Sequence, residues 1–256
     1  MKNGKCKLCL KEKPLLKKSH IIPDFFYVQA GIYNDSHQIH KIDVQKFLER
    51  KHISYVPTGV YDKDILCQEC DNNIIGILET YGRKVLFGGL SKDEEIRHEN
   101  FRNPIDGFAY SIFENVNYNK FKLFLLSILW RSAISKNDFF INVDIPENYI
   151  EDLRRMIYDG NPGKFNDFPI ITMTYLKDEK VPADFIGQPI KSVTEKGILI
   201  TFLLAGFVFV FYVQNDFIDL ERIEHFTPSP DNKFGIMHFP EGQGWEFIFK
   251  YTNIKK

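Results

Sequence analysis

The four cysteines of this chain form two Cys-x-x-Cys pairs, and these pairs are the residues whose spacing points most directly to chemistry. Cys6 is paired with Cys9 and Cys67 with Cys70, so the pairs use every cysteine in the sequence. Two such pairs that meet in the fold bind one zinc ion with tetrahedral geometry. A thioredoxin-like redox motif needs one pair in a βαβ setting, which fits two separated pairs poorly. The sequence therefore predicts a structural zinc site made by all four cysteines.

Two other residues with catalytic chemistry lie beside these pairs. His20 stands between the pairs in Lys-Ser-His-Ile-Ile-Pro, and Asp71 follows Cys70 directly. A zinc ion that clamps the two pairs together would bring the segment around His20 near Asp71. Asp71 would supply an oxygen ligand to a hard cation such as Mg²⁺ or Mn²⁺. His20 would take a proton from an attacking water.

This order of motifs resembles the HNH family of endonucleases, also called ββα-metal or His-Me finger nucleases. The resemblance is to its zinc-containing four-cysteine subset, similar to phage recombination endonuclease VII, and it covers about residues 6–87. It implies that the cysteines bind a structural zinc and that His20 activates water. It also implies that Asp71 binds the catalytic Mg²⁺ or Mn²⁺. By analogy with the family, the substrate is DNA rather than RNA, and the setting is phage defence or mobile-element biology.

The chain departs from the family pattern at two positions and in one spacing. Ser19 stands where the family usually has Asp, Glu or His as a second metal ligand, and a hydroxyl is a far weaker ligand. Asp71 stands where the family has His or Asn, so the net ligand charge is preserved with its position exchanged. Residues 21–66 make an unusually long connection to the second cysteine pair, which predicts a helical insertion over residues 24–52.

Other interpretations of these residues stay open. His20 could brace the zinc module without catalysis, Asp71 could cap the helix that follows it, and Ser19 could serve a turn. The module as a whole could be catalytically inactive and bind nucleic acid or a protein partner. A weaker alternative is an assembly subunit whose zinc is only structural.

The net charge of −1, from 33 basic and 34 acidic residues, excludes a protein whose whole surface is a polycation. The first 23 residues nevertheless carry seven lysines and one glutamate, a local charge of +6. Lys17 and Lys18 run up to His20, where a phosphate backbone would have to lie, so they are predicted to contact nucleic acid. The alternative is an ordinary solvated surface.

The elements that position these residues indicate an α+β protein of two parts. Residues 1–90 are predicted to form an HNH-like zinc module, with a helix after Cys70 that ends at Gly88-Gly89. Residues 91–256 are predicted to form a C-terminal α+β domain of unknown role with antiparallel strands. Its first stretch, residues 91–116, is polar and is expected to be a linker or cover.

The C-terminal part is expected to hold two helices followed by strands. The helices are predicted over residues 117–135 and 146–158, and strands from residue 168 onward, including the segments Pro-Ile-Ile-Thr-Met-Thr-Tyr-Leu, Lys-Phe-Gly-Ile-Met-His-Phe and Gly-Trp-Glu-Phe-Ile-Phe-Lys-Tyr. Residues 197–213 are apolar but shorter than the roughly 20 residues of a membrane span. Ala205-Gly206 divides them, which favours a buried β-hairpin.

The N-terminus has no apolar signal region, and paired cysteines of this kind are typical of a reducing compartment, so a cytoplasmic protein without membrane partners is expected.

Arg131 lies in the apolar helix and must find a partner or an exit to water. The other histidines carry no motif and are expected to be surface or structural residues: His37, His40, His52, His98, His225 and His238.

Overall fold

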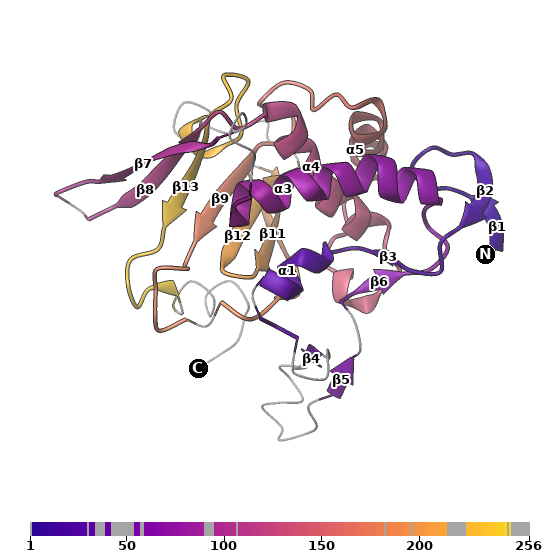
Figure 1. Ribbon diagram of the computed structural model, residues 1–256, viewed down its shortest axis with the longest axis horizontal. Helices are drawn as coiled ribbons and strands as arrows, with labels where there is room; N and C mark the ends of the chain where they lie inside the picture. Colours follow the sequence, from indigo (N-terminus) through magenta and orange to yellow (C-terminus); the bar gives the residue numbers. More distant parts are fainter. Residues whose placement is uncertain are drawn as a thin grey trace.

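The structure is a computed structural model that describes residues 2–29, 31–33, 39–41, 54–56, 59–89, 95–105, 107–181, 183–195, 197–213, 224–244 and 246. Figure 1 shows an antiparallel-rich sheet with helices packed against it and the N-terminal strands at one end of the molecule. The predicted α+β class is confirmed by this large sheet and its helices.

A seven-stranded sheet of order β10-β11-β12-β9-β13-β8-β7 forms the C-terminal half of the described chain. Adjacent strands in this sheet pair antiparallel, except for β13 and β9, which pair parallel. The strands are β7 (Arg97–Arg102), β8 (Ala109–Glu114), β9 (Ile170–Thr174), β10 (Ile190–Thr194), β11 (Gly197–Leu204), β12 (Phe207–Tyr212) and β13 (Phe234–His238).

The apolar segment 197–213 forms the predicted hairpin of β11 and β12, two inner strands of this sheet. Ala205 (φ 52°) and Gly206 (φ 86°) make a two-residue turn with both φ angles positive, as tight hairpins require. A Cβ at Gly206 would lie 2.2 Å from a Leu176 carbon, so glycine is also required there by space. Among the described residues, no helix is long and apolar enough to cross a membrane.

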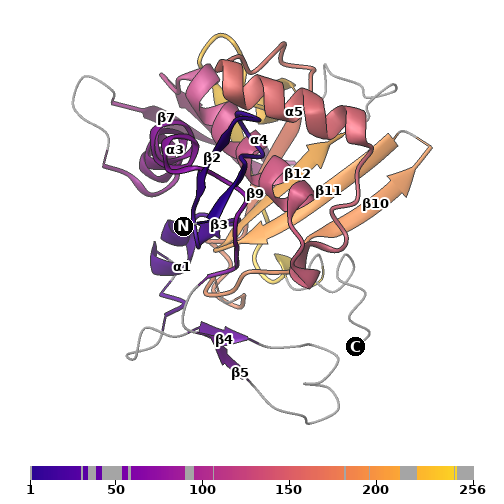
Figure 2. The same ribbon diagram turned by 90° about the vertical axis from the view of Figure 1, so that its right-hand side faces the viewer.

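Helices α4 (Tyr118–Ile134) and α5 (Glu147–Asp159) lie across one face of the sheet (Figure 2). They match the helices predicted over 117–135 and 146–158. The Asn117 side chain caps α4 by accepting a hydrogen bond from the Lys120 amide at 2.9 Å. Helix α4 packs on the sheet through Phe121, whose ring centroid lies 4.7 Å from that of Phe234. Two short 3₁₀ turns complete this half, η3 (Asp138–Phe140) and η4 (Glu224–Phe226).

The N-terminal part consists of short strand pairs and one long helical segment. Strands β1 (Lys2–Lys5) and β2 (Glu12–Leu15) form a hairpin, and β3 (Ser19–His20) pairs antiparallel with β6 (Tyr61–Asp62). After β6, a π-helical turn η1 (Cys70–Ile75) continues into helix α3 (Gly76–Phe87), which ends at Gly88 as predicted (φ 85°). Along the chain, the connection from β3 to β6 contains helix α1 (Asp24–Gln29) and the paired strands β4 (Ile39–Lys41) and β5 (Ser54–Val56).

The predicted helical insertion over residues 24–52 is confirmed at α1, whereas residues 39–41 are a strand paired with β5. The last part of the predicted insertion, residues 43–52, lies outside the described residues. The strands predicted around residues 169–176 and 233–239 are β9 and β13. The strand predicted over 244–251 falls largely outside the described residues.

The expectation that residues 91–116 are a linker or cover is wrong, because β7 and β8 form a hairpin that belongs to the large sheet and lies at its edge. All six residues of β7 are exposed, so the segment lacks the alternation of apolar and polar residues that marks a half-buried strand.

One hydrophobic core runs through both halves of the chain. It joins apolar residues of the N-terminal part, such as Ile21 and Phe26, to α4 and to the strands of the large sheet. Helix α3 approaches α4 so closely that a Cβ at Gly82 would lie 2.4 Å from the Phe124 ring. Glycine at this position therefore sets the distance between the two helices, and residues on α3 and α4 can share one site.

Candidate functional site

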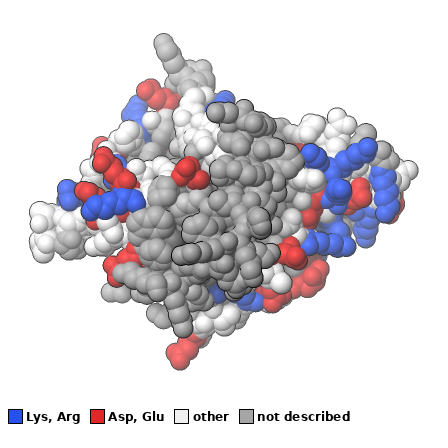
Figure 3. Space-filling view, turned by 90° about the horizontal axis from the view of Figure 1, so that it is seen from below, with Lys and Arg blue, Asp and Glu red and all other residues white. Residues whose placement is uncertain are grey.

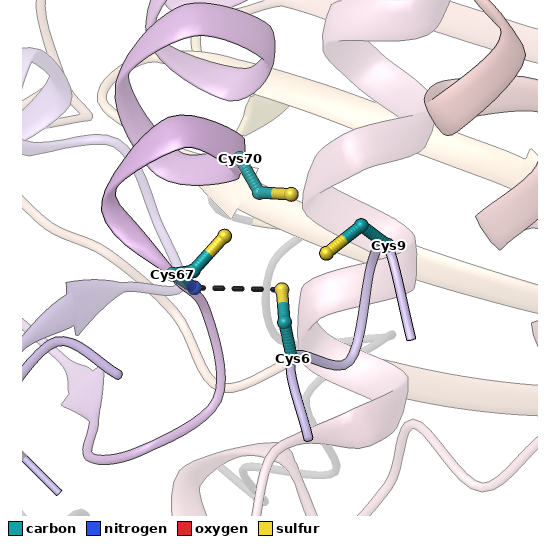
Figure 4. A group of neighbouring side chains, drawn as sticks. All are labelled: Cys6, Cys9, Cys67 and Cys70. Atoms are coloured by element: carbon teal, nitrogen blue, oxygen red, sulfur yellow. Dashed lines mark hydrogen bonds between the residues drawn. The ribbon is translucent and has the colours of Figure 1, made fainter. Parts of the chain in front are cut away.

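The two cysteine pairs meet at the end of the molecule that carries β1 and β2. Cys6 and Cys9 lie on the turn between β1 and β2, and Cys67 and Cys70 lie where the chain enters η1. The four sulfur atoms all lie within 4.8 Å of one another, and Figure 4 shows them pointing toward a common centre. This meeting was predicted from the sequence and is confirmed.

The geometry of this cluster fits a metal ion such as zinc. Tetrahedral Zn–S bonds of about 2.3 Å put the sulfurs about 3.8 Å apart, which is compatible with four sulfurs that all lie within 4.8 Å of one another. All four thiols are free rather than joined in disulfides, and the Cys67 amide donates a hydrogen bond to Cys6 Sγ at 3.4 Å. Amide donors of this kind stabilise metal-bound thiolate sulfur.

The charge on these thiols also depends on their neighbours. Burial, followed by the neighbouring sulfurs, raises the pKa of Cys70 far above its usual range. Burial also works to raise the pKa of Cys9, but the Lys11 backbone and the other thiols outweigh it and leave the pKa lowered. Four thiolates so close together need a cation to offset their repulsion, because charges repel strongly in a partly buried site.

The strand pair β3–β6 and the helix after it position the second group of predicted residues. Ser19 pairs with Asp62 and His20 with Tyr61 across the two strands. The chain then runs through the second cysteine pair into η1 and α3. An isolated bridge between Leu15 and Cys67 joins the two cysteine-bearing segments just before β3. The cluster is thus connected directly to the strand that carries His20.

Asp71 is the second residue of the π-helical turn η1. Its amide donates to the Cys67 carbonyl at 3.0 Å, and its carbonyl accepts from the Gly76 amide. Wide turns of this kind are frequent at functional sites. Burial raises the pKa of the Asp71 carboxyl, while Arg131, the Ser19 hydroxyl and His20 oppose that rise. The structure therefore brings Ser19 and His20 together with Asp71.

Ser19 is 1% exposed, and its hydroxyl is a buried polar group of the site. Its hydroxyl lies close enough to the Asp71 carboxylate for a hydrogen bond that lowers the carboxyl pKa, although this contact lacks the geometry of a regular hydrogen bond. A buried hydroxyl without such a bond costs free energy unless a water or an ion completes it. The group beside Asp71 is thus suited to receive a small ligand.

Arg131 enters the site from α4, and the sequence did not indicate this contact. It is 1% exposed, and its Nη1 donates to the His20 carbonyl oxygen at 2.6 Å. The same nitrogen lies 2.6 Å from Glu79 Oε1 on α3. Of the two outcomes expected for Arg131, a partner or an exit to water, the structure shows a partner, and it is Glu79. The position of Arg131 in the apolar helix was the only sequence signal for this role.

Arg131 also changes how the carboxylates of the site are used. Because Glu79 pairs with Arg131, it neutralises a positive charge that would otherwise repel a cation. Asp71 has no ion pair with Lys or Arg among the described residues; burial raises the pKa of its carboxyl, and the positive charge of Arg131 opposes that rise. Asp71 is therefore the carboxylate of this group that is best placed to bind a cation.

The basic N-terminal segment covers the outside of the cysteine cluster. Six of its lysines are exposed, and blue side chains gather at this end of the molecule in Figure 3. Lys17 and Lys18 are exposed just before β3, and Lys18 Nζ lies 5.0 Å from the centre of the Tyr61 ring. Lys13 is committed to an ion pair with Glu69. The remaining exposed lysines are Lys2, Lys5, Lys7 and Lys11.

The other histidines lie away from this site or outside the described residues. His238 contacts the Ser111 hydroxyl at 2.6 Å, and His98 stacks on the Phe113 ring. His40 lies in β4 and His225 in η4. The positions predicted as surface at His37 and His52 lie outside the described residues.

Comparison of the chain with protein-family models, with curated proteins and with solved structures finds no match.

Proposed function

We propose that this protein is a metal-dependent HNH-like endonuclease that hydrolyses phosphodiester bonds in DNA, with zinc in the cysteine cluster. The observation that carries the proposal is the meeting of His20 and Asp71 on a strand pair followed by a helix, directly beside four converging cysteines. This arrangement of two antiparallel strands, a helix and a metal site is the one expected for a ββα-metal module.

The proposed roles follow from the chemistry of each residue. His20 accepts a proton from the attacking water, since imidazole is the side chain most often used as a general base. Asp71 is the carboxylate ligand of a divalent ion, Mg²⁺ or Mn²⁺, and the Ser19 hydroxyl lies where it can contact that ion or one of its waters. When bound, such an ion stabilises negative charge on the phosphate and on the leaving oxygen.

The same donor set motivates a second candidate function. One carboxylate and one hydroxyl make a weak cation site, because hard divalent ions prefer several charged oxygens. A module with the same fold and a lost second ligand would bind nucleic acid or a protein partner without cleaving it. Ser19 is the residue that favours this alternative.

Incubation of purified full-length protein with supercoiled plasmid and Mg²⁺ or Mn²⁺ separates the two functions. The nuclease proposal predicts nicked or linear products from the wild type. His20→Ala should lower the cleavage rate by at least about 10²-fold, as expected for loss of a general base. Asp71→Ala should abolish cleavage in either metal.

The control is Lys177→Gln, an exposed residue away from the site, which should cleave like the wild type. Thermal melting of each variant excludes unfolding as the cause of a loss. Plasmid binding without cleavage in the presence of either Mg²⁺ or Mn²⁺ would contradict the nuclease proposal and favour the non-catalytic module. Cleavage of an RNA transcript instead of the plasmid would reassign the substrate.

A further inference from the structure

A groove of about 460 Å³ lies along α3, on a flank that the residues discussed above do not use. It runs from Asn72 in η1 to Lys84 near the end of α3, and Lys120 at the start of α4 forms part of its wall. The two charged side chains among its described lining residues are both lysines, so the charge that this lining carries is positive.

The amine of Lys120 is held in a defined place. Its Nζ lies 5.4 Å from the centre of the Tyr81 ring, a cation–π contact that orients the amine without neutralising it. The Tyr81 hydroxyl is itself fixed, because it accepts a hydrogen bond from the Asn117 amide at 2.7 Å. The groove therefore presents a positive charge that is arranged before any ligand arrives.

The remaining lining residues suit a sugar–phosphate backbone. Thr80 donates its hydroxyl proton to the Gly76 carbonyl at 2.8 Å, so its oxygen can accept from a water that bridges to a phosphate. Asn72 offers an amide that is exposed to solvent. Ile77, which is 56% exposed, gives an apolar surface. The phosphates and sugar faces of a DNA strand match amines, an amide donor and an apolar surface in one strip.

The groove also lies on a line with the basic N-terminal segment. Turn η1 and helix α3 contain 6 and 12 residues, and they start at the cysteine cluster, at the end of the molecule where β1 and β2 lie (Figure 1). A segment of this length spans about 25 Å. The lysines of the basic N-terminal segment lie near its first end, and Lys84 lies near its last. Asp71 is close to the first end, where the cleaved phosphate would lie.

We infer that the groove between Asn72, Lys84 and Lys120 binds the phosphate backbone of the nucleic acid away from the cleaved bond. This inference rests on the proposed function and adds a substrate length to it. A backbone that follows α3 from the cysteine cluster to Lys120 covers about seven base pairs at 3.4 Å each. Shorter duplexes cannot reach both ends.

Binding of fluorescent duplex DNA to full-length His20→Ala protein, without added Mg²⁺, tests this inference at several salt concentrations. Duplexes of about 5 and about 14 base pairs are compared, since only the longer one spans the helix. In the same background, Lys84→Gln with Lys120→Gln should weaken binding of the longer duplex by about tenfold or more. The slope of log K against log salt should fall by about 2, one for each lost phosphate contact. The short duplex should lose less.

Two matched variants control for general charge effects. Lys177→Gln with Lys180→Gln removes the same charge from exposed positions elsewhere and should leave the salt slope unchanged. Lys84→Arg with Lys120→Arg keeps the charge and should bind like the parent. Equal binding by the Lys84 and Lys120 glutamine variant and its parent would overturn the groove while plasmid cleavage by the wild type still supported the nuclease. Absence of DNA binding and cleavage by the wild type would overturn both.

Discussion

Arg131 is the residue on which the geometry of the proposed site depends most. Its side chain is buried in α4 and joins the His20 carbonyl on β3 to the Glu79 carboxylate on α3. One guanidinium therefore fixes the strand that carries His20 against the helix that follows Asp71. A planar guanidinium with several donors suits this task better than an ammonium group does.

Arg131→Met should destabilise the protein by about 3 kcal/mol, because it leaves the Glu79 carboxylate and the His20 carbonyl without their partner. Urea unfolding measures the change. The control is Arg155→Met, whose side chain is 64% exposed and pairs with Glu151 on the surface; loss of such an exposed ion pair costs about 1 kcal/mol or less. Equal stability of the two variants would contradict the proposed role of Arg131.

The residues themselves differ in how far the sequence could predict them. The cysteine cluster was predictable because two identical spacings use every cysteine. The pairing of Arg131 with the His20 carbonyl was not, since these residues are 111 positions apart and a backbone oxygen leaves no mark in a sequence. The π-helical turn at Asp71 was likewise not predictable, because no residue type in Cys-Asp-Asn-Asn-Ile-Ile specifies it.

At the scale of elements, α4 is the helix that packs against elements of both the N-terminal and the C-terminal part. It contacts α3 on one side and α5 on the other, and it is buried on nearly all faces. Strong apolar patterns made α4 and the β11–β12 hairpin predictable from sequence. Strand β7 was not predictable because its exposed polar residues take their structure from pairing with β8 rather than from burial.

Helix α4 also carries a buried lysine that should make stability depend on pH. Burial lowers the pKa of Lys122 to about 7, with Asp167 opposing the change, and its Nζ donates to the Tyr118 hydroxyl at 3.2 Å. Because the folded pKa is below the unfolded value of about 10.4, the unfolded chain binds more protons between these pH values. The free energy of unfolding should therefore rise as pH increases from about 7 to about 10.

Lys122→Met should flatten this rise, since it removes the titrating group while keeping most of the apolar side chain. Urea unfolding at pH 7 and pH 9.5 measures the difference in both proteins. The wild type should gain on the order of 1–3 kcal/mol more than the variant over this interval. Parallel pH profiles for the two proteins would contradict the buried, easily deprotonated state of Lys122.

At the scale of the whole molecule, the cysteine cluster is attached to the rest of the protein by two arginines and a shared core. Arg154 on α5 donates to the Leu8 carbonyl, within the first cysteine turn, at 2.8 Å, and Arg131 holds the His20 carbonyl. The core continues from the N-terminal part into the large sheet. The proposed boundary near residue 90 stays a prediction, but these contacts lead us to expect that both parts unfold together.

Removal of the metal should therefore affect the whole molecule. Elemental analysis should find one tightly bound zinc per chain. A chelator, or Cys67→Ser, should lower the melting temperature by about 10 °C in a single transition, because metal binding contributes to folding. Absence of zinc from the pure protein would contradict the metal centre. Two separate transitions, with only the lower one metal-dependent, would contradict the coupling of the two parts.

The central claim is that His20 is the general base of a nuclease centre completed by Asp71, and chemical rescue tests it most directly. His20→Gly should cleave plasmid at least about 10²-fold more slowly than the wild type in Mn²⁺, and added imidazole should restore a measurable part of the rate. Asp71→Ala should not respond to imidazole, since it lacks the metal ligand rather than the base. Cleavage by His20→Gly at the wild-type rate, or absence of cleavage by the wild type in both Mg²⁺ and Mn²⁺, would contradict the claim.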